Sequence, residues 1–187
     1  MVSQPPRPAT PGSSQGQFTI VFEKQPPGQV RPGAKFTMPV VVKVEPTGPQ
    51  EPNPNLGLSL NVLLKNEDGS DAAGGILSGQ RVDSIYSEDG DTLRGRVAFS
   101  DLRISQAGRY RFCVVLNISD LENGVTEAQQ ITEDVVIDVN ETAPENQVPS
   151  NEDIALFQRL LDYSQPGIRP EDIRRWRALR ERYDARN

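Results

Sequence analysis

Apolar and polar residues alternate along much of the first two-thirds of the chain, which predicts a series of short strands. The clearest case is 56–65, where one face of a half-buried strand would carry Leu58, Leu60, Val62 and Leu64. Other runs rich in β-branched and aromatic residues predict strands at 18–24, 35–44, 93–99, 108–118 and 131–139, with one short strand within 76–86. Turn-forming segments separate these runs. Six or seven short strands with this spacing favour a β-sandwich.

The segment from Phe99 to Cys113 predicts a strand, a tight corner and a second strand. Its Gly108-x-Tyr110-x-Phe112 spacing is typical of a tyrosine corner, in which a Tyr hydroxyl bonds back to the preceding loop. In antibody domains a disulfide cysteine stands two residues after that Tyr, and here the position is Phe112. We therefore expect apolar packing in place of a disulfide.

Two amphipathic helices are expected near the C-terminus. Ser150 and Asp153 have the spacing of a capping arrangement that opens a helix ending at Tyr163. Pro166-Gly167 then breaks the helical pattern, and Pro170 suits the first turn of a second helix that ends near Tyr183.

Composition and pattern together divide the chain into four segments. Residues 1–16 are rich in Pro, Ser, Gln and Gly and are expected to be a disordered tail. The predicted sandwich covers 17–140, a polar linker covers 141–149, and the helices occupy 150–187. The predicted fold class is all-β, an immunoglobulin-like sandwich with a C-terminal α-helical extension.

The chain has no histidine and a single cysteine, Cys113. Without histidine, Ser-His and Cys-His catalysis are excluded, and one cysteine cannot build a Cys/His metal site. A carboxylate-based enzyme stays open only as the weakest reading, because no paired-carboxylate motif supports it. We therefore expect no enzyme activity, no cofactor and no metal site.

The cysteine usage favours a reduced intracellular compartment, and neither an apolar run long enough for a membrane span nor a secretory signal is expected.

Charge is distributed unevenly along the chain. The net charge is −6, yet residues 168–187 hold seven arginines against four acids and so carry +3, which leaves −9 on the remainder. An acidic body disfavours nonspecific DNA binding by the whole surface but allows a local basic patch.

Several pieces of this sequence resemble a fungal velvet-family domain, in the same order along the chain. They are the strand and basic loop from Phe18 to Arg31, the strand Pro39-Val-Val-Val-Lys-Val44, the pair Leu93-x-Gly95, the element Phe99-x-Asp101-Leu102 and the strand Gly108-Arg-Tyr-Arg-Phe112. The resemblance covers roughly residues 17–140. It implies a Rel-homology-like sandwich and a regulator of development, sporulation and secondary metabolism, found in nucleus and cytoplasm. It also implies homo- or heterodimers with other velvet proteins and binding of double-stranded DNA.

Lys24, Arg31 and Lys35 match the DNA-contacting loop of that family, and a solvated loop is the alternative reading. Strand geometry places Arg109 and Arg111 together on the face opposite the core, where they could meet phosphates, a partner's carboxylates or the chain's own acids.

One side of the second helix carries an apolar stripe that is a candidate partner-binding surface, although such stripes often pack on their own domain. It consists of Ile173, Trp176, Leu179 and Tyr183. Two functions remain open from the sequence: a velvet-like DNA-binding regulator, and a protein-interaction adaptor with an immunoglobulin-like fold that binds no DNA.

Overall fold

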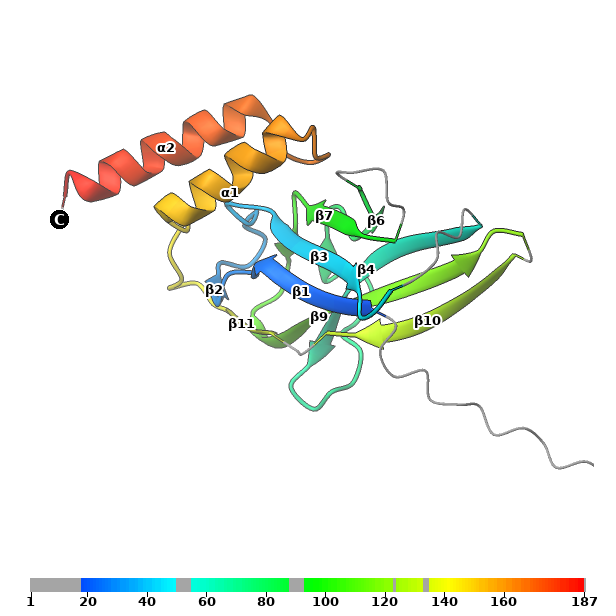
Figure 1. Ribbon diagram of the computed structural model, residues 1–187. Helices are drawn as coiled ribbons and strands as arrows, with labels where there is room; N and C mark the ends of the chain where they lie inside the picture. Colours follow the sequence, from blue (N-terminus) through cyan, green and yellow to red (C-terminus); the bar gives the residue numbers. More distant parts are fainter. Residues whose placement is uncertain (1–17, 50–54, 88–92, 123, 133–134, 187) are drawn as a thin grey trace, which may run out of the picture.

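The computed structural model describes residues 18–49, 55–87, 93–122, 124–132 and 135–186. Within these ranges the protein is mostly β-sheet, followed by two helices (Figure 1). The expected tail at 1–16 lies outside the described residues.

The strands form three antiparallel or mixed sheets. The first has the order β1-β3-β7, the second β2-β11-β9-β4-β6 with β10 also paired to β9, and the third contains only β5 and β8. The strands are β1 (Phe18–Lys24), β2 (Gln29–Val30), β3 (Val40–Pro46), β4 (Leu56–Asn66), β5 (Leu77–Ser78), β6 (Val82–Ser84), β7 (Gly95–Phe99), β8 (Arg103–Ile104), β9 (Gly108–Asp120), β10 (Val125–Ile131) and β11 (Val135–Val139).

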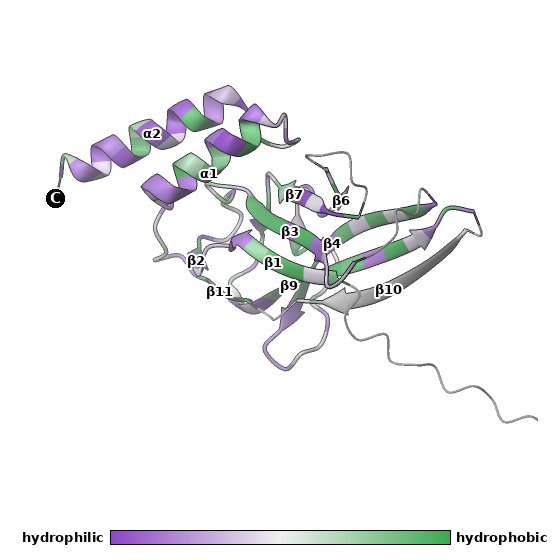
Figure 2. Cartoon of the chain, viewed as in Figure 1, coloured by the Kyte–Doolittle hydropathy of each residue, from purple (hydrophilic) through white to green (hydrophobic). Residues whose placement is uncertain are grey.

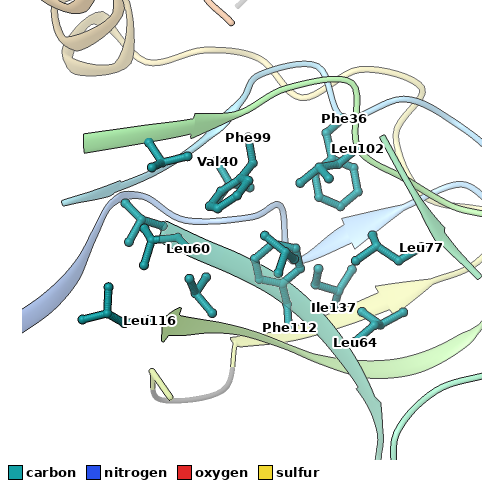
Figure 3. Close-up of a cluster of buried hydrophobic side chains, with 14 of the residues drawn as sticks. Phe36, Val40, Leu60, Leu64, Leu77, Phe99, Leu102, Phe112, Leu116 and Ile137 are labelled. Atoms are coloured by element: carbon teal, nitrogen blue, oxygen red, sulfur yellow. The ribbon is translucent and has the colours of Figure 1, made fainter. Parts of the chain in front are cut away.

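One hydrophobic core lies between the three-stranded and six-stranded sheets (Figure 3). Phe112 is fully buried near its centre and packs against Phe22 of β1, with ring centroids 6.3 Å apart. The alternation predicted for β4 is confirmed, because Leu58, Leu60, Val62 and Leu64 are all buried in this core.

Strand β3 is apolar on both faces because each face is covered. Val40 and Val42 point into the core between the sheets, whereas Val41 points into a second core under the helices. Ala98 of β7 also faces this second core. A strand covered on both sides carries a continuous apolar run rather than an alternating one, which explains the sequence Val-Val-Val at 40–42.

Two helices cover the outer face of β3 and β7. They are α1 (Asn151–Asp162) and α2 (Pro170–Asp184). The capping arrangement predicted at Ser150 is confirmed: the Asp153 amide donates to Ser150 Oγ at 3.0 Å, and the Ser150 amide donates to Asp153 Oδ2 at 2.9 Å. Figure 2 shows that α2 is largely hydrophilic with isolated apolar positions, as a helix with one packed side should be.

Three strand predictions differ from the structure. The segment 76–86, expected to hold one short strand, holds both β5 and β6. The expected strand at 131–139 is two elements, because β10 ends at Ile131 and β11 begins at Val135, with both paired to β9. The expected strand at 35–44 begins only at Val40, after Pro39, because proline has no amide hydrogen for a sheet ladder.

The corner at Tyr110 is built differently from the expectation. Tyr110 is buried, and its ring lies over Gly108, where an added Cβ would stand 3.2 Å from the Tyr110 hydroxyl oxygen. No hydrogen bond from this hydroxyl is found to the described part of the chain. Within the described residues, Tyr110 therefore packs its ring on Gly108 without the expected hydroxyl bond.

Candidate functional site

The three basic residues that match the velvet DNA-contacting loop are each bonded to another part of the chain. Lys24 Nζ lies 2.8 Å from Asp153 Oδ1 in the first turn of α1, and Lys35 forms an ion pair with Asp101. Arg31 Nε donates to the Ala143 carbonyl oxygen at 2.8 Å. These bonds hold the three side chains at separate places, so they do not form one basic cluster.

Arg109 and Arg111 lie on the outer face of the six-stranded sheet, as strand geometry predicted. Arg109 Nη1 is 3.0 Å from Glu67 Oε1, with both side chains more than half exposed. Arg111 stands opposite Lys65 of β4 and near Asp68, whose pKa is lowered chiefly by hydrogen bonds from the side chain and backbone of Ser70 and, to a smaller extent, by attraction to Arg111. Acidic neighbours therefore reduce the positive charge of this face.

The candidate partner-binding stripe of α2 is divided by the fold. Ile173 and Trp176 are 2% and 1% exposed and belong to the second core, so a partner cannot reach them in this fold. Trp176 packs on Phe157 of α1 with ring centroids 4.5 Å apart. Leu179 is half-buried and Tyr183 is 46% exposed. The accessible part of the stripe is therefore the C-terminal end of α2, which projects beyond the strands in Figure 1.

A groove of about 240 Å³ follows this accessible end of α2. It is lined by Asn146, Val148, Leu179, Arg182, Tyr183 and Arg186. We refer to it as the α2 groove. Val148 is 40% exposed, so the groove offers apolar surface from two segments that lie far apart in the sequence.

The walls of the α2 groove are held in place by bonds outside it. Arg180 binds Asp184 through two nitrogens, at 2.8 and 3.0 Å, and its guanidinium carbon lies 5.5 Å from the centre of the Tyr183 ring. On the other wall, the Gln147 side chain accepts from the Thr37 amide at 3.0 Å, and the Gln147 amide donates to Thr37 Oγ1 at 3.0 Å. The segment expected to be a linker is therefore fixed to the sheets beside the groove.

A second cavity, of about 190 Å³, lies where the N-terminal end of α2 meets the loop before β3. Its charged lining is internally neutralised: Asp172 is buried between Arg169 and Arg175, at 2.9 and 3.0 Å, and Lys35 binds Asp101. The hydrogen bond to Asp172 raises the pKa of Arg169. This cavity offers a ligand no charge that the chain has not already paired.

Sequence reasoning found Leu179 and Tyr183 through the helical period but did not single out the opposite wall. Val148 is one apolar residue in a polar segment, and Asn146 has no distinguishing pattern. Only the packing of residues 146–148 beside α2 makes them part of the groove.

Comparison with known proteins leaves the family of this chain open. No family model matches it, and no curated protein matches it. Among solved structures, an ASH/PapD-like domain of human CEP192 (PapD-like domain 7) is similar with a TM-score of 0.38 and 14% sequence identity, over 76% of this chain and 98% of that chain. None of this tests the resemblance to velvet proteins, which stays a prediction.

Two further searches concern the described residues only. They contain no group of three or more His, Cys, Asp or Glu side chains placed to hold a metal ion. Neither of the described helices has the length and apolar content that crossing a membrane requires.

Proposed function

We propose that this chain is a protein-interaction module with an immunoglobulin-like β-sandwich, and that it binds a segment of a partner protein in the α2 groove. The observation that carries the proposal is the apolar surface of Leu179, Tyr183 and Val148, which remains accessible although the rest of the same helical stripe is buried. Accessible aromatic and aliphatic side chains in a groove are the usual anchor points of peptide recognition.

The way in which α2 is covered supports this assignment. Its first half is packed through Ile173 and Trp176, whereas Leu179 is only partly buried against the second core and lines the groove together with Tyr183 and Val148. Because one face of the helix is packed on the domain, the accessible face is already ordered. A partner that binds it therefore causes little further loss of conformational entropy in the helix.

The paired state of the basic residues favours an interaction module over a DNA-binding regulator. Lys24 and Lys35 are bonded to carboxylates, and Arg31 to a backbone carbonyl. DNA phosphates would have to compete with these bonds, and the chain carries a net charge of −6. Both the charge of the chain and the accessible groove therefore support a protein-interaction module that binds no DNA.

Selection from an unbiased random peptide library tests the proposal directly. The immobilised full chain should enrich a recurring motif with a bulky apolar residue, and Tyr183→Ala should abolish the enrichment. Tyr163→Ala is the matched control, because Tyr163 is 53% exposed at the end of α1 and does not line the groove. Lack of any enriched motif, or equal loss in both variants, would overturn the assignment of the groove.

A mobility-shift assay on randomised duplex DNA tests the competing function. We expect no selected sequence and no shift that Lys24→Ala, Arg31→Ala or Lys35→Ala changes. Enrichment of a short duplex sequence that depends on these residues would make the DNA-binding regulator the better description.

A further inference from the structure

We propose that the occupant of the α2 groove is an acidic peptide segment that inserts one bulky apolar side chain between Tyr183 and Val148. This inference rests on the proposed function, since it names the chemistry of the partner for the same groove. The two arginines that line the groove and the volume of the groove carry the inference.

The arginines of α2 fall into two groups. Arg169 and Arg175 bind Asp172, and Arg180 binds Asp184, so these three are neutralised within the chain. Arg182 and Arg186 form no ion pair with any carboxylate among the described residues, and both line the groove. Among the described residues, the Arg182 guanidinium bonds only to the Ala178 carbonyl oxygen, at 3.1 Å.

The charged side chains that line the groove are therefore all positive. It contains two arginines, one amide and three apolar or aromatic side chains, with no acidic residue. Arginine can bind a carboxylate through two parallel hydrogen bonds, which gives orientation as well as attraction. A partner with carboxylates flanking its apolar residue would supply the charge that the chain itself does not place there.

The size of the groove limits what can enter it. At about 240 Å³ it is below the range of about 300–1,000 Å³ typical of pockets for drug-sized ligands. It can hold a single large side chain, such as that of Leu, Phe or Trp, with the peptide backbone running over the rim. An anchored peptide therefore fits better than a free small molecule.

The charge of the groove lining also disfavours a basic partner. A basic peptide would meet Arg182 and Arg186 directly, and like charges at contact distance disfavour a complex. The acidic surface around α1, which includes Glu152 and Asp153, lies in a separate shallow depression that lacks the groove residues. The two arginines therefore repel basic peptides as well as attract acidic ones.

Two focused peptide libraries test this inference. Both carry a fixed central apolar residue, and they differ only in whether the flanking positions are Asp/Glu or Lys/Arg. We expect the full chain to enrich the acidic library alone. The tightest fluorescein-labelled acidic peptide should lose about two- to five-fold in affinity with Arg182→Gln or Arg186→Gln, the range that one exposed charge pair supplies.

Arg174→Gln is the matched control, because Arg174 is an exposed arginine of the same helix that does not line the groove. It should leave the affinity unchanged apart from the small effect of net charge. Raising the salt from 50 to 500 mM should weaken the wild-type complex more than either groove variant.

The outcomes separate the two levels of the hypothesis. If the basic library is enriched and Tyr183→Ala removes the enrichment, the groove is an interaction site but the proposal of an acidic partner is wrong. If no library is enriched, both proposals fail. If a labelled 20-bp DNA duplex binds and Arg182→Gln weakens it while peptides do not bind, the occupant is nucleic acid and the inference is overturned.

Discussion

The indole Nε1 of Trp176 donates a hydrogen bond of 2.8 Å to the backbone carbonyl oxygen of Thr37, 139 residues earlier in the chain. This buried bond joins the middle of α2 to the segment before β3. It fixes the direction of the helix relative to the sheets, and with it the position of the groove at the helix end.

Replacing Trp176 by Phe should therefore destabilise the fold. The variant keeps an aromatic ring beside Phe157 but removes the only indole donor, so we expect a loss of about 1–3 kcal/mol in the free energy of unfolding. Urea denaturation followed by circular dichroism measures it. Tyr163→Phe, at an exposed site, should change stability by less than about 0.5 kcal/mol, and an equal effect of both changes would contradict the role given to the bond.

Gly95 allows the start of β7 to lie unusually close to the segment that follows β6. A Cβ built on Gly95 would lie 2.1 Å from the Tyr86 carbonyl oxygen, a backbone atom that cannot rotate away. Gly95→Ala should lower the free energy of unfolding by about 1–3 kcal/mol, since the backbone of 85–86 would have to shift. A lowered thermal unfolding midpoint is the readout.

Gly74→Ala provides the control for that substitution. No atom lies within 4 Å of the Cβ position at Gly74, and the position is not strained by a left-handed conformation. The change should be neutral or stabilising by up to about 1 kcal/mol through the unfolded state. Comparable destabilisation by the two alanines would show that close approach is not the reason for Gly95.

The ion pair between Lys35 and Asp101 should contribute to acid sensitivity. The hydrogen bond from Lys35 holds the pKa of Asp101 below its usual value, with burial opposing the shift more weakly. A carboxyl group with a lowered pKa in the folded state stabilises the fold at pH values above its unfolded pKa of about 3.9. It loses that contribution as the pH falls through the folded pKa.

Asp101→Asn removes this dependence while keeping a residue that tolerates the backbone φ of +60° at this position. Thermal midpoints recorded between pH 6 and pH 2.5 should fall less steeply for the variant than for the wild type. Parallel curves would mean that the pair does not contribute to stability.

Cys113 should be unreactive in the folded protein. It is fully buried on β9, and its Sγ lies 3.8 Å from the Leu63 carbonyl oxygen. Alkylation by a water-soluble maleimide should require opening of the β4–β9 pairing and so should accelerate by orders of magnitude in denaturant. Rapid modification of the native chain would show that this pairing opens locally.

The sequence predicts best those elements whose signal lies within one segment. β4 and α1 follow from an alternating pattern and a capping pair, each contained in a dozen residues. By contrast, β2 and β8 have two residues each and exist only through pairing with β11 and β5. β10 has few apolar residues, and its place is decided by its pairing with β9.

The same reason explains which parts of the candidate site could be predicted. Leu179 and Tyr183 follow from the helical period, but that period cannot divide a stripe into a packed half and an open half. The decisive information was the apolar run at Val40–Val42, which indicates a strand covered on both faces and hence a helix on its outer side. That Arg182 forms no ion pair within the described ranges depends on where the acidic side chains lie in the folded chain, which the sequence does not show.

Val41 of β3 and Ala98 of β7 pack against the two helices in the second core, so the outer face of the three-stranded sheet is buried by the helical pair. A chain truncated after Pro149 would expose this apolar face to solvent, and exposed apolar patches promote aggregation. Deletion mapping would then report insolubility as lost binding, so any partner of the helical end has to be located with point substitutions in the intact chain.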